Sequence, residues 1–258
     1  MTTVAADHLG HGIVVFRKAL SVDSLLVDSY MHYLQEQDAA EKYLKSGDTA
    51  VNSGGYEFSD DSIGHAPLRY SDTLPHGLPI EYRKFVEKLE NTNYKCLVEY
   101  CKIFPTAVEA VTWKKIGHFA VYTQGQGIGC HSDSAVPLVD GKPVYGQSPL
   151  YNTLTCGVSL TSDYTGGELY FKMWDISVTL NAGDVAIYPS TFIGAHEVLP
   201  VKSGKRIAYL QWFCHGDPGN MPPLEDENID DLASSIWLNN LRNDVGPQNM
   251  YQRTVSQG

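Results

Sequence analysis

Short runs of β-branched and aromatic residues, separated by Gly, Pro, Asn and Ser, dominate the sequence from Thr112 to Cys214. Runs of this kind predict β-strands. The clearest three are Val185–Tyr188, Glu197–Val201 and Arg206–Phe213. Earlier strands are predicted at 112–123, around His131, at Leu154–Leu160 and at Gly166–Phe171, with a hairpin turn at Asp140-Gly141. Six or more short strands at this spacing favour an antiparallel sandwich or barrel.

Apolar residues in the first part of the chain recur instead with the spacing of amphipathic helices. After a short strand at Gly12–Arg17, a helix is predicted from Ser21 to about Leu44. Its apolar positions form one stripe, made of Leu25, Leu26, Tyr30, Tyr33 and Leu34. Two further helices are predicted at Ile80–Glu90 and Asn93–Phe104, because the polar residues between them offer capping side chains.

Two other segments lack a sustained hydrophobic period. Lys45 to Pro79 is rich in Gly, Ser, Asp and Pro. A segment of this length is typical of either a functional lid or a disordered region, and the sequence leaves both interpretations open. Beyond His215, an acidic run at Glu225–Asp231 suits the start of a helix. That helix is predicted to run through Leu232, Ile236 and Leu241.

The composition limits the classes of function. The chain has 258 residues, 43% of them hydrophobic, and a net charge of −11 with no basic run. This charge argues against non-specific binding to nucleic acids or anionic membranes. The five cysteines form no CxxC pair, and no stretch of about 18 apolar residues occurs. We therefore expect a soluble, cytoplasmic protein with reduced thiols and with neither a nucleic-acid nor a membrane partner, and the oligomeric state stays open.

The same patterns predict one domain over residues 1–258. Within it, residues 1–111 would form a helical support and a lid, and residues 112–215 would form the β-rich core. Residues 216–258 would form an acidic helical extension.

Three side chains within the β-rich region form a candidate metal site. In His131-Ser132-Asp133 the imidazole and the carboxylate are two residues apart, so an extended backbone would send both to one face. His196 lies at the entry to a later strand. Two imidazoles and one carboxylate are the ligand set of a facial triad, which holds Fe(II) and leaves coordination positions open.

The order of these motifs resembles a known family. An HxD motif follows a glycine-rich turn, then come a GGEL strand, a strand ending in Tyr188-Pro189-Ser190, His196, and a cation ten residues later. Between Trp113 and Phe213 the chain resembles the Fe(II)/2-oxoglutarate-dependent dioxygenases, in particular their prolyl 4-hydroxylase-like branch. The resemblance implies a mostly β fold with flanking helices, namely a double-stranded β-helix, or jelly roll, buttressed by the N-terminal helices.

The resemblance also implies roles for individual residues. His131, Asp133 and His196 would be the catalytic iron ligands, and Arg206 would pair with the distal carboxylate of 2-oxoglutarate. Tyr122 resembles a tyrosine that lines the cosubstrate pocket, and Trp212 matches a frequent aromatic residue on the last core strand. Where some relatives place a second tyrosine near the cosubstrate, this chain has Thr155–Ser159, so the second hydrogen bond to the distal carboxylate is unassigned.

Strand geometry separates Arg206 from the neighbouring Lys205. On an extended strand Arg206, Ala208, Leu210 and Trp212 share one face, and this largely apolar set is expected to face the barrel interior. Lys205 would then point the opposite way.

The activity implied by the resemblance is hydroxylation of a C–H bond in a prolyl or other residue of a peptide or protein. 2-Oxoglutarate and O2 would be cosubstrates, succinate and CO2 products, and ascorbate a candidate reductant. One alternative is hydroxylation of a free amino acid or small metabolite. A second is a jelly-roll binding or sensor module without turnover, which the intact His131, Asp133, His196 and Arg206 argue against.

Overall fold

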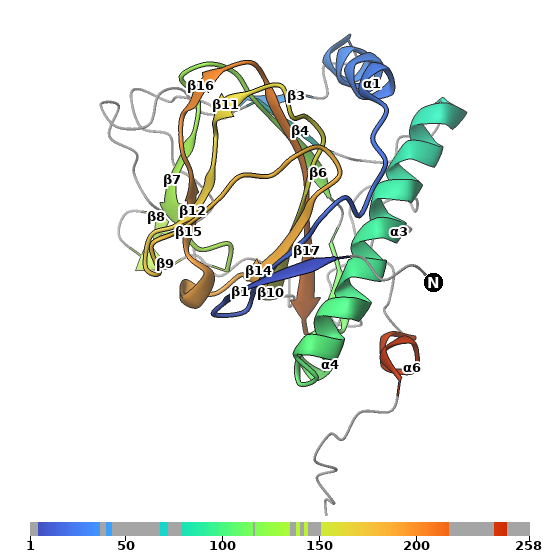
Figure 1. Ribbon diagram of the computed structural model, residues 1–258, viewed down its shortest axis with the longest axis vertical. Helices are drawn as coiled ribbons and strands as arrows, with labels where there is room; N and C mark the ends of the chain where they lie inside the picture. Colours follow the sequence, from blue (N-terminus) through green and yellow to red (C-terminus); the bar gives the residue numbers. More distant parts are fainter. Residues whose placement is uncertain are drawn as a thin grey trace, which may run out of the picture.

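The computed structural model of the chain describes residues 5–36, 40–42, 68–71, 79–115, 117–134, 138–139, 142–143, 151–216 and 240–246. Antiparallel β-sheets form its centre, and helices lie on one flank (Figure 1).

The larger sheet has nine strands in the order β1-β2-β14-β10-β17-β6-β4-β3, with β5 also paired to β17. Its strands are β1 Ala6–Gly10, β2 Ile13–Phe16, β3 Ala40–Lys42, β4 Leu68–Ser71, β5 Trp113–Lys114, β6 His118–Tyr122, β10 Tyr151–Ser159, β14 Val185–Pro189 and β17 Arg206–His215. Strands distant in sequence are neighbours here, because β10 pairs with both β14 and β17.

The second sheet has four strands in the order β13-β12-β15-β7. They are β7 Ile128–His131, β12 Leu169–Phe171, β13 Ile176–Val178 and β15 His196–Val198. Two-stranded pairs complete the β-structure, formed by β8 Leu138–Val139 with β9 Lys142–Pro143 and by β11 Thr165–Gly166 with β16 Val201–Ser203. The pairing of β8 with β9 agrees with the hairpin predicted at Asp140-Gly141, although these two turn residues lie outside the described ranges.

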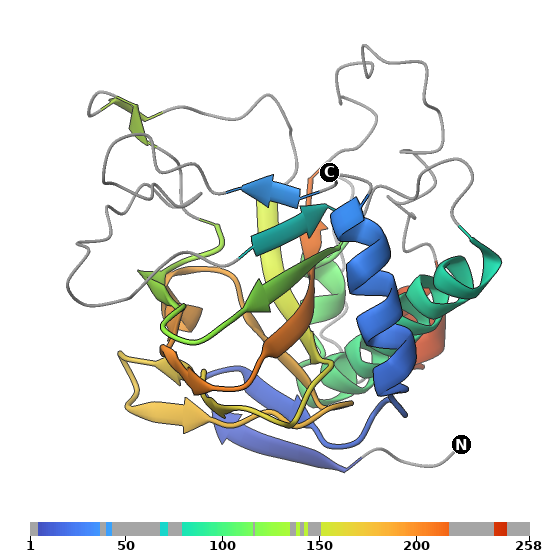
Figure 2. The same cartoon turned by 90° about the horizontal axis from the view of Figure 1, so that it is seen from above.

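Helices cover the outer face of the larger sheet. They are α1 Ser24–Glu36, α3 Ile80–Ile103, α4 Ala107–Ala110 and α6 Leu241–Val245, and a short 3-10 helix, η1 Phe192–Gly194, precedes β15. Figure 1 shows α1 and α3 on one flank of the barrel, and Figure 2 shows the same arrangement from above. None of the helices in the described ranges is long and apolar enough to cross a membrane.

Alternate residues of β17 enter two separate hydrophobic cores. Ile207, Tyr209 and Phe213 pack with α1 and α3 in the first core. Leu210 packs in the second core, between the two sheets, with residues such as Phe171. This alternation follows from the period of two along a strand, and it places one face of β17 inside the barrel.

The first predicted helix is shorter than its pattern suggested. Helix α1 ends at Glu36, and Ala40–Lys42 forms β3, so the predicted extension to about Leu44 is wrong. From Gln35 to Lys42 the sequence offers no apolar side chain larger than alanine, so a longer helix would gain little burial there.

The predicted break between the next two helices is also wrong, because α3 continues through it. Thr92 donates its hydroxyl hydrogen bond to the Lys88 carbonyl one turn earlier (2.8 Å). Asn93 is fully buried and donates from Nδ2 to Gln211 Oε1 on β17 (3.1 Å). These polar side chains are therefore used inside the helix and toward the sheet, and not as caps.

Two predicted segments lie largely outside the described residues. Of the Lys45–Pro79 segment, Leu68–Ser71 forms β4 and pairs with β6, which corrects the prediction of a wholly structureless stretch. Of the predicted C-terminal helix, Leu241 lies in α6, which packs on α3. The division into a lid, a core and an extension stays a prediction.

A half-buried polar network fastens α3 to the larger sheet. Glu90 Oε2 pairs with the Lys114 ammonium group, and Glu90 Oε1 accepts hydrogen bonds from Tyr209 Oη and Gln211 Nε2, both at 3.2 Å. Gln211 Oε1 in turn accepts the bond from Asn93. A single carboxylate thus serves three donors from β5 and β17.

Removing this carboxylate should destabilise the fold. Because Lys114 would keep a buried charge without its partner, Glu90→Ala is expected to lower the free energy of unfolding by about 3–5 kcal/mol. Glu99→Ala is the matched control on the same helix, since Glu99 pairs with Lys102 at the surface. Its expected cost is below about 1 kcal/mol. Urea unfolding of both variants measures the difference, and equal losses would contradict the structural role of Glu90.

Candidate active site

Pairing between β7 and β15 brings the two histidines of the candidate metal site together. His131 and His196 are direct cross-strand partners, and their ring centroids are 4.5 Å apart. With Asp133, their ligand atoms all lie within 4.8 Å of one another. Strand β7 ends at His131, so Asp133 lies in the following turn and not on an extended strand as predicted. Its carboxylate nevertheless reaches the same point.

Backbone carbonyls fix the orientation of both imidazoles. Nδ1 of His131 donates to the Gly129 carbonyl (2.8 Å), and Nδ1 of His196 donates to the Gly194 carbonyl (3.0 Å). A carbonyl oxygen can only accept, so Nδ1 carries the proton in each ring. The Nε2 atoms therefore turn toward Asp133 with their lone pairs available for a metal ion.

Thr155 holds the carboxylate of Asp133. Its hydroxyl donates to Asp133 Oδ2 (2.5 Å) and accepts a hydrogen bond from Ser190 Oγ (2.8 Å). Asp133 Oδ1 lies 3.3 Å from His131 Nε2. Sequence reasoning missed Thr155 and Ser190, because only the strand pairing shows that they meet Asp133. The Thr155 hydroxyl therefore orients the Asp133 carboxylate through this hydrogen bond.

The protonation states suit metal binding. Burial by itself would raise the pKa of Asp133, but the neighbouring His196 and His131 and the Thr155 hydrogen bond outweigh it, so the pKa falls below its usual range. Burial, together with the neighbouring His131, lowers the pKa of His196 to about 4. At neutral pH the site therefore holds a carboxylate and a neutral His196 imidazole, the forms that ligate metals.

Arg206 is a buried cation in the same barrel interior. Its side chain is on β17 opposite Tyr122 of β6, with Cζ 4.9 Å from the centre of the Tyr122 ring. The residue is only 4% exposed, and Nε and Nη1 have no hydrogen-bond partner among the described residues. An added Cβ at Gly167, which has a φ of +68°, would lie 3.0 Å from Arg206 Cδ, so glycine there makes room for the guanidinium. Such a cation fits an anionic ligand.

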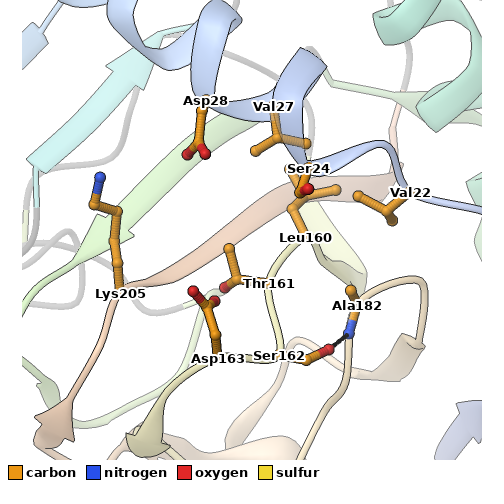
Figure 3. Close-up of a pocket in the computed structure, with 10 residues that line it drawn as sticks. All are labelled: Val22, Ser24, Val27, Asp28, Leu160, Thr161, Ser162, Asp163, Ala182 and Lys205. Carbon is orange, nitrogen blue, oxygen red and sulfur yellow. Dashed lines mark hydrogen bonds between the residues drawn. The ribbon is translucent and has the colours of Figure 1, made fainter.

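Lys205 points away from this interior, as the strand period predicted. It lines an outer pocket of about 530 Å³ together with Asp28 of α1 and Asp163 (Figure 3). Arg206 is thus the one of the two neighbouring cations that enters the barrel.

Trp212 lies toward the other end of β17. It is the cross-strand partner of Thr155, and its ring is 5.0 Å from that of His118. Trp212 is six positions after Arg206 on this strand, which corresponds to about 20 Å along an extended backbone. Its Nε1 is buried without a hydrogen-bond partner among the described residues. The predicted contact of Trp212 with the cosubstrate stays a prediction.

Tyr188 was noted in the sequence only as part of a strand end. In the structure it is 2% exposed, and its hydroxyl lies 3.2 Å from His196 Nε2. Burial, together with the nearby Asp133, raises the pKa of Tyr188 well above its ordinary value. The phenol therefore stays protonated and can donate a hydrogen bond.

Comparisons with known proteins agree with this geometry. Residues 117–214 match the profile of the 2OG-Fe(II) oxygenase superfamily. A PKHD-type hydroxylase of Saccharophagus degradans is 36% identical over 97 residues, which are 37% of this chain and 41% of the relative. Another, of Teredinibacter turnerae, is 32% identical over 146 residues, which are 54% of this chain and 60% of the relative. The matched regions thus span less than two thirds of these relatives.

Solved structures share the fold at low sequence identity. A prolyl hydroxylase from Trichoplax adhaerens, in complex with a hypoxia inducible factor peptide fragment, has a TM-score of 0.55 at 15% identity. The structural match covers 82% of this chain and 86% of the Trichoplax chain. A viral collagen prolyl hydroxylase from Paramecium Bursaria Chlorella virus-1, in a 2OG complex, has a TM-score of 0.51 at 15% identity. This match covers 80% of this chain and 96% of the viral chain. The predicted resemblance is confirmed: this chain has the double-stranded β-helix fold of prolyl hydroxylases, and its core matches the 2OG-Fe(II) oxygenase superfamily.

Proposed function

We propose that this chain is an Fe(II)- and 2-oxoglutarate-dependent hydroxylase that acts on a prolyl or other residue in a peptide or protein. The observation that carries the proposal is the convergence of His131, Asp133 and His196 in the same barrel interior as Arg206, whose buried Nε and Nη1 have no hydrogen-bond partner among the described residues.

The three side chains fit Fe(II) in donor type and orientation. Two Nε2 atoms and one carboxylate oxygen make a 2-His-1-carboxylate set, which suits non-haem Fe(II) with open positions. Hydrogen bonds from Thr155 and to the Gly129 and Gly194 carbonyls hold the donors in place before the metal binds. Bound Fe(II) would supply the activation of O2 that oxidation of a C–H bond needs.

Arg206 would bind the distal carboxylate of 2-oxoglutarate. The Nε and Nη1 atoms, which have no hydrogen-bond partner in the described ranges, belong to one planar guanidinium, and that group can grip a carboxylate through two hydrogen bonds. Phe171 of the inter-sheet core lies beside the site, with its ring 5.9 Å from that of His196. In the proposed reaction R–H, 2-oxoglutarate and O2 give R–OH, succinate and CO2.

A peptide substrate is favoured over a small molecule by the solved relatives. One is a collagen prolyl hydroxylase, and another is in complex with a peptide fragment. A free amino acid or small metabolite is the competing substrate class, and ascorbate as a reductant stays a prediction.

The metal ligands should be individually indispensable, because a three-ligand site has no spare donor. His131→Ala, Asp133→Ala and His196→Ala are each expected to abolish succinate formation and to weaken the binding of one Fe(II) per chain. Anaerobic metal titration and a succinate assay measure both. His32→Ala is the control, since its exposed ring pairs only with Glu36 among the described residues. Wild-type-like succinate formation by His196→Ala would contradict the assignment of these three residues as metal ligands.

Arg206 and Lys205 should differ sharply in their effect on 2-oxoglutarate. Loss of the charged hydrogen bonds in Arg206→Ala is expected to raise the apparent 2-oxoglutarate constant about tenfold to a hundredfold. Fe(II) binding should survive, because no ligand is removed. Lys205→Ala should change neither quantity, because this side chain lines the outer pocket (Figure 3). The reverse pattern in a 2-oxoglutarate titration would mean that the wrong cation faces the barrel.

Substrate class is tested by succinate release across proline-containing peptides and free amino acids. We expect certain peptides to stimulate release above the substrate-free rate and to gain the mass of one oxygen atom. Stimulation by free amino acids alone would favour a small-molecule hydroxylase. Binding of Fe(II) and 2-oxoglutarate without any succinate would favour a module that lacks turnover.

A further inference from the structure

The Tyr188 hydroxyl lies beside the candidate metal site but has no role in the function proposed above. Tyr188 is on β14, where it is the cross-strand partner of Thr155. Its ring packs edge-on against Phe171 and His196, with centroids 5.1 and 4.8 Å away. The ring is therefore fixed by packing, and the hydroxyl has a defined position.

The hydroxyl donates its hydrogen to His196. Nδ1 of His196 already donates to the Gly194 carbonyl, so Nε2 of the neutral ring is an acceptor. The contact of 3.2 Å between Tyr188 Oη and His196 Nε2 is accordingly an O–H···N bond. Across the described part of the chain it is the one hydrogen bond of this hydroxyl.

A metal ion and the Tyr188 hydroxyl compete for the same lone pair. The Nε2 atom of His196 has one lone pair, and a metal held by the triad would occupy it. The phenol, only 2% exposed, would then be a buried donor without an acceptor. Buried donors are rarely left unpaired, so another acceptor is required when the metal binds.

Few acceptors remain among the metal ligands themselves. Asp133 Oδ2 already accepts from Thr155, and Asp133 Oδ1 faces His131 as the proposed metal-binding oxygen. The neighbouring Phe171 offers only an apolar ring. The oxygens of a cosubstrate that shares the metal are the acceptors that fit.

We propose that the Tyr188 hydroxyl hydrogen-bonds the metal-chelating end of the 2-oxo acid, its 1-carboxylate or 2-oxo group, while Arg206 holds the distal carboxylate. The inference rests on the proposed function and assigns the two ends of the cosubstrate to two different side chains. Tyr188 and Thr155 are cross-strand partners with different roles in this arrangement. Thr155 donates its hydroxyl hydrogen to Asp133, whereas Tyr188 would donate to the cosubstrate.

The test compares two ligands on Mn(II)-loaded protein. 2-Oxoglutarate carries both ends, whereas pyruvate keeps the chelating end and lacks the distal carboxylate. Titration calorimetry should show that Tyr188→Phe weakens both ligands by a similar factor of about tenfold. Arg206→Ala should weaken 2-oxoglutarate and leave pyruvate unchanged.

Two controls separate this role from a structural one. Tyr100→Phe removes the hydroxyl of another residue that is 2% exposed; this hydroxyl donates to the Gly12 carbonyl (2.8 Å) away from the site, and its loss should leave both affinities unchanged. In the anaerobic Fe(II) complex with 2-oxoglutarate, Tyr188→Phe should shift the visible charge-transfer band, because a hydrogen bond to the chelating group is lost. A purely structural loss would not move that band.

Other outcomes overturn the inference. If Tyr188→Phe weakens 2-oxoglutarate but not pyruvate, the hydroxyl serves the distal end. If it weakens Mn(II) binding and leaves both ligands unaffected, Tyr188 acts on the metal ligands alone. Failure of the proposed function looks different, since wild-type protein would then bind neither 2-oxoglutarate nor pyruvate in its Mn(II)-loaded form.

Discussion

The pairing of β7 with β15 is the constraint on which the site depends. These short strands are hydrogen-bonded neighbours in the smaller sheet, and their register makes His131 and His196 direct partners. A slip of one residue would send one imidazole to the opposite face of that sheet. The sheet is kept in place by the inter-sheet core, in which Phe171 packs on Tyr188 of the larger sheet. Strand pairing within the smaller sheet thus sets the distance between the two imidazoles, and apolar packing between the sheets holds that sheet in place.

Strand β17 connects that interior to the helical flank. On its outer face, Tyr209 and Gln211 bond to Glu90 of α3, which also pairs with Lys114. On its inner face, Arg206 enters the barrel beside Tyr122. Functional side chains on a strand anchored from behind are held more firmly than side chains on a loop. Helix α3 therefore contributes to the site indirectly, because it fixes the strand that carries the cation.

Periodicity in the sequence predicts much of this arrangement, and cross-strand contacts explain what it misses. The inward face of Arg206 follows from alternation along one strand, and the grouping of His131 with Asp133 follows from short spacing. The bond from Thr155 to Asp133 joins residues 22 apart and depends on the pairing of separate strands. The continuous helix α3 was missed for a similar reason. The local sequence predicts Asn93 as a cap, whereas its hydrogen-bond partner, Gln211, is 118 residues away.

The site also breaks the rule that buried polar groups are paired within the protein. Two buried nitrogen atoms of Arg206, Nε and Nη1, have no hydrogen-bond partner among the described residues. Each such group costs about 1–3 kcal/mol when it is left unsatisfied. Elsewhere on the same strand Gln211, fully buried, has its amide bonded to Glu90, Lys115 and Asn93. Arg206, like Trp212 Nε1 on the same strand, is thus a position where the fold accepts a local cost, and such positions are typically those that bind a ligand. A carboxylate that accepts hydrogen bonds from that guanidinium would remove the cost of the unsatisfied N–H groups. The removal of this cost would contribute to the affinity for the ligand.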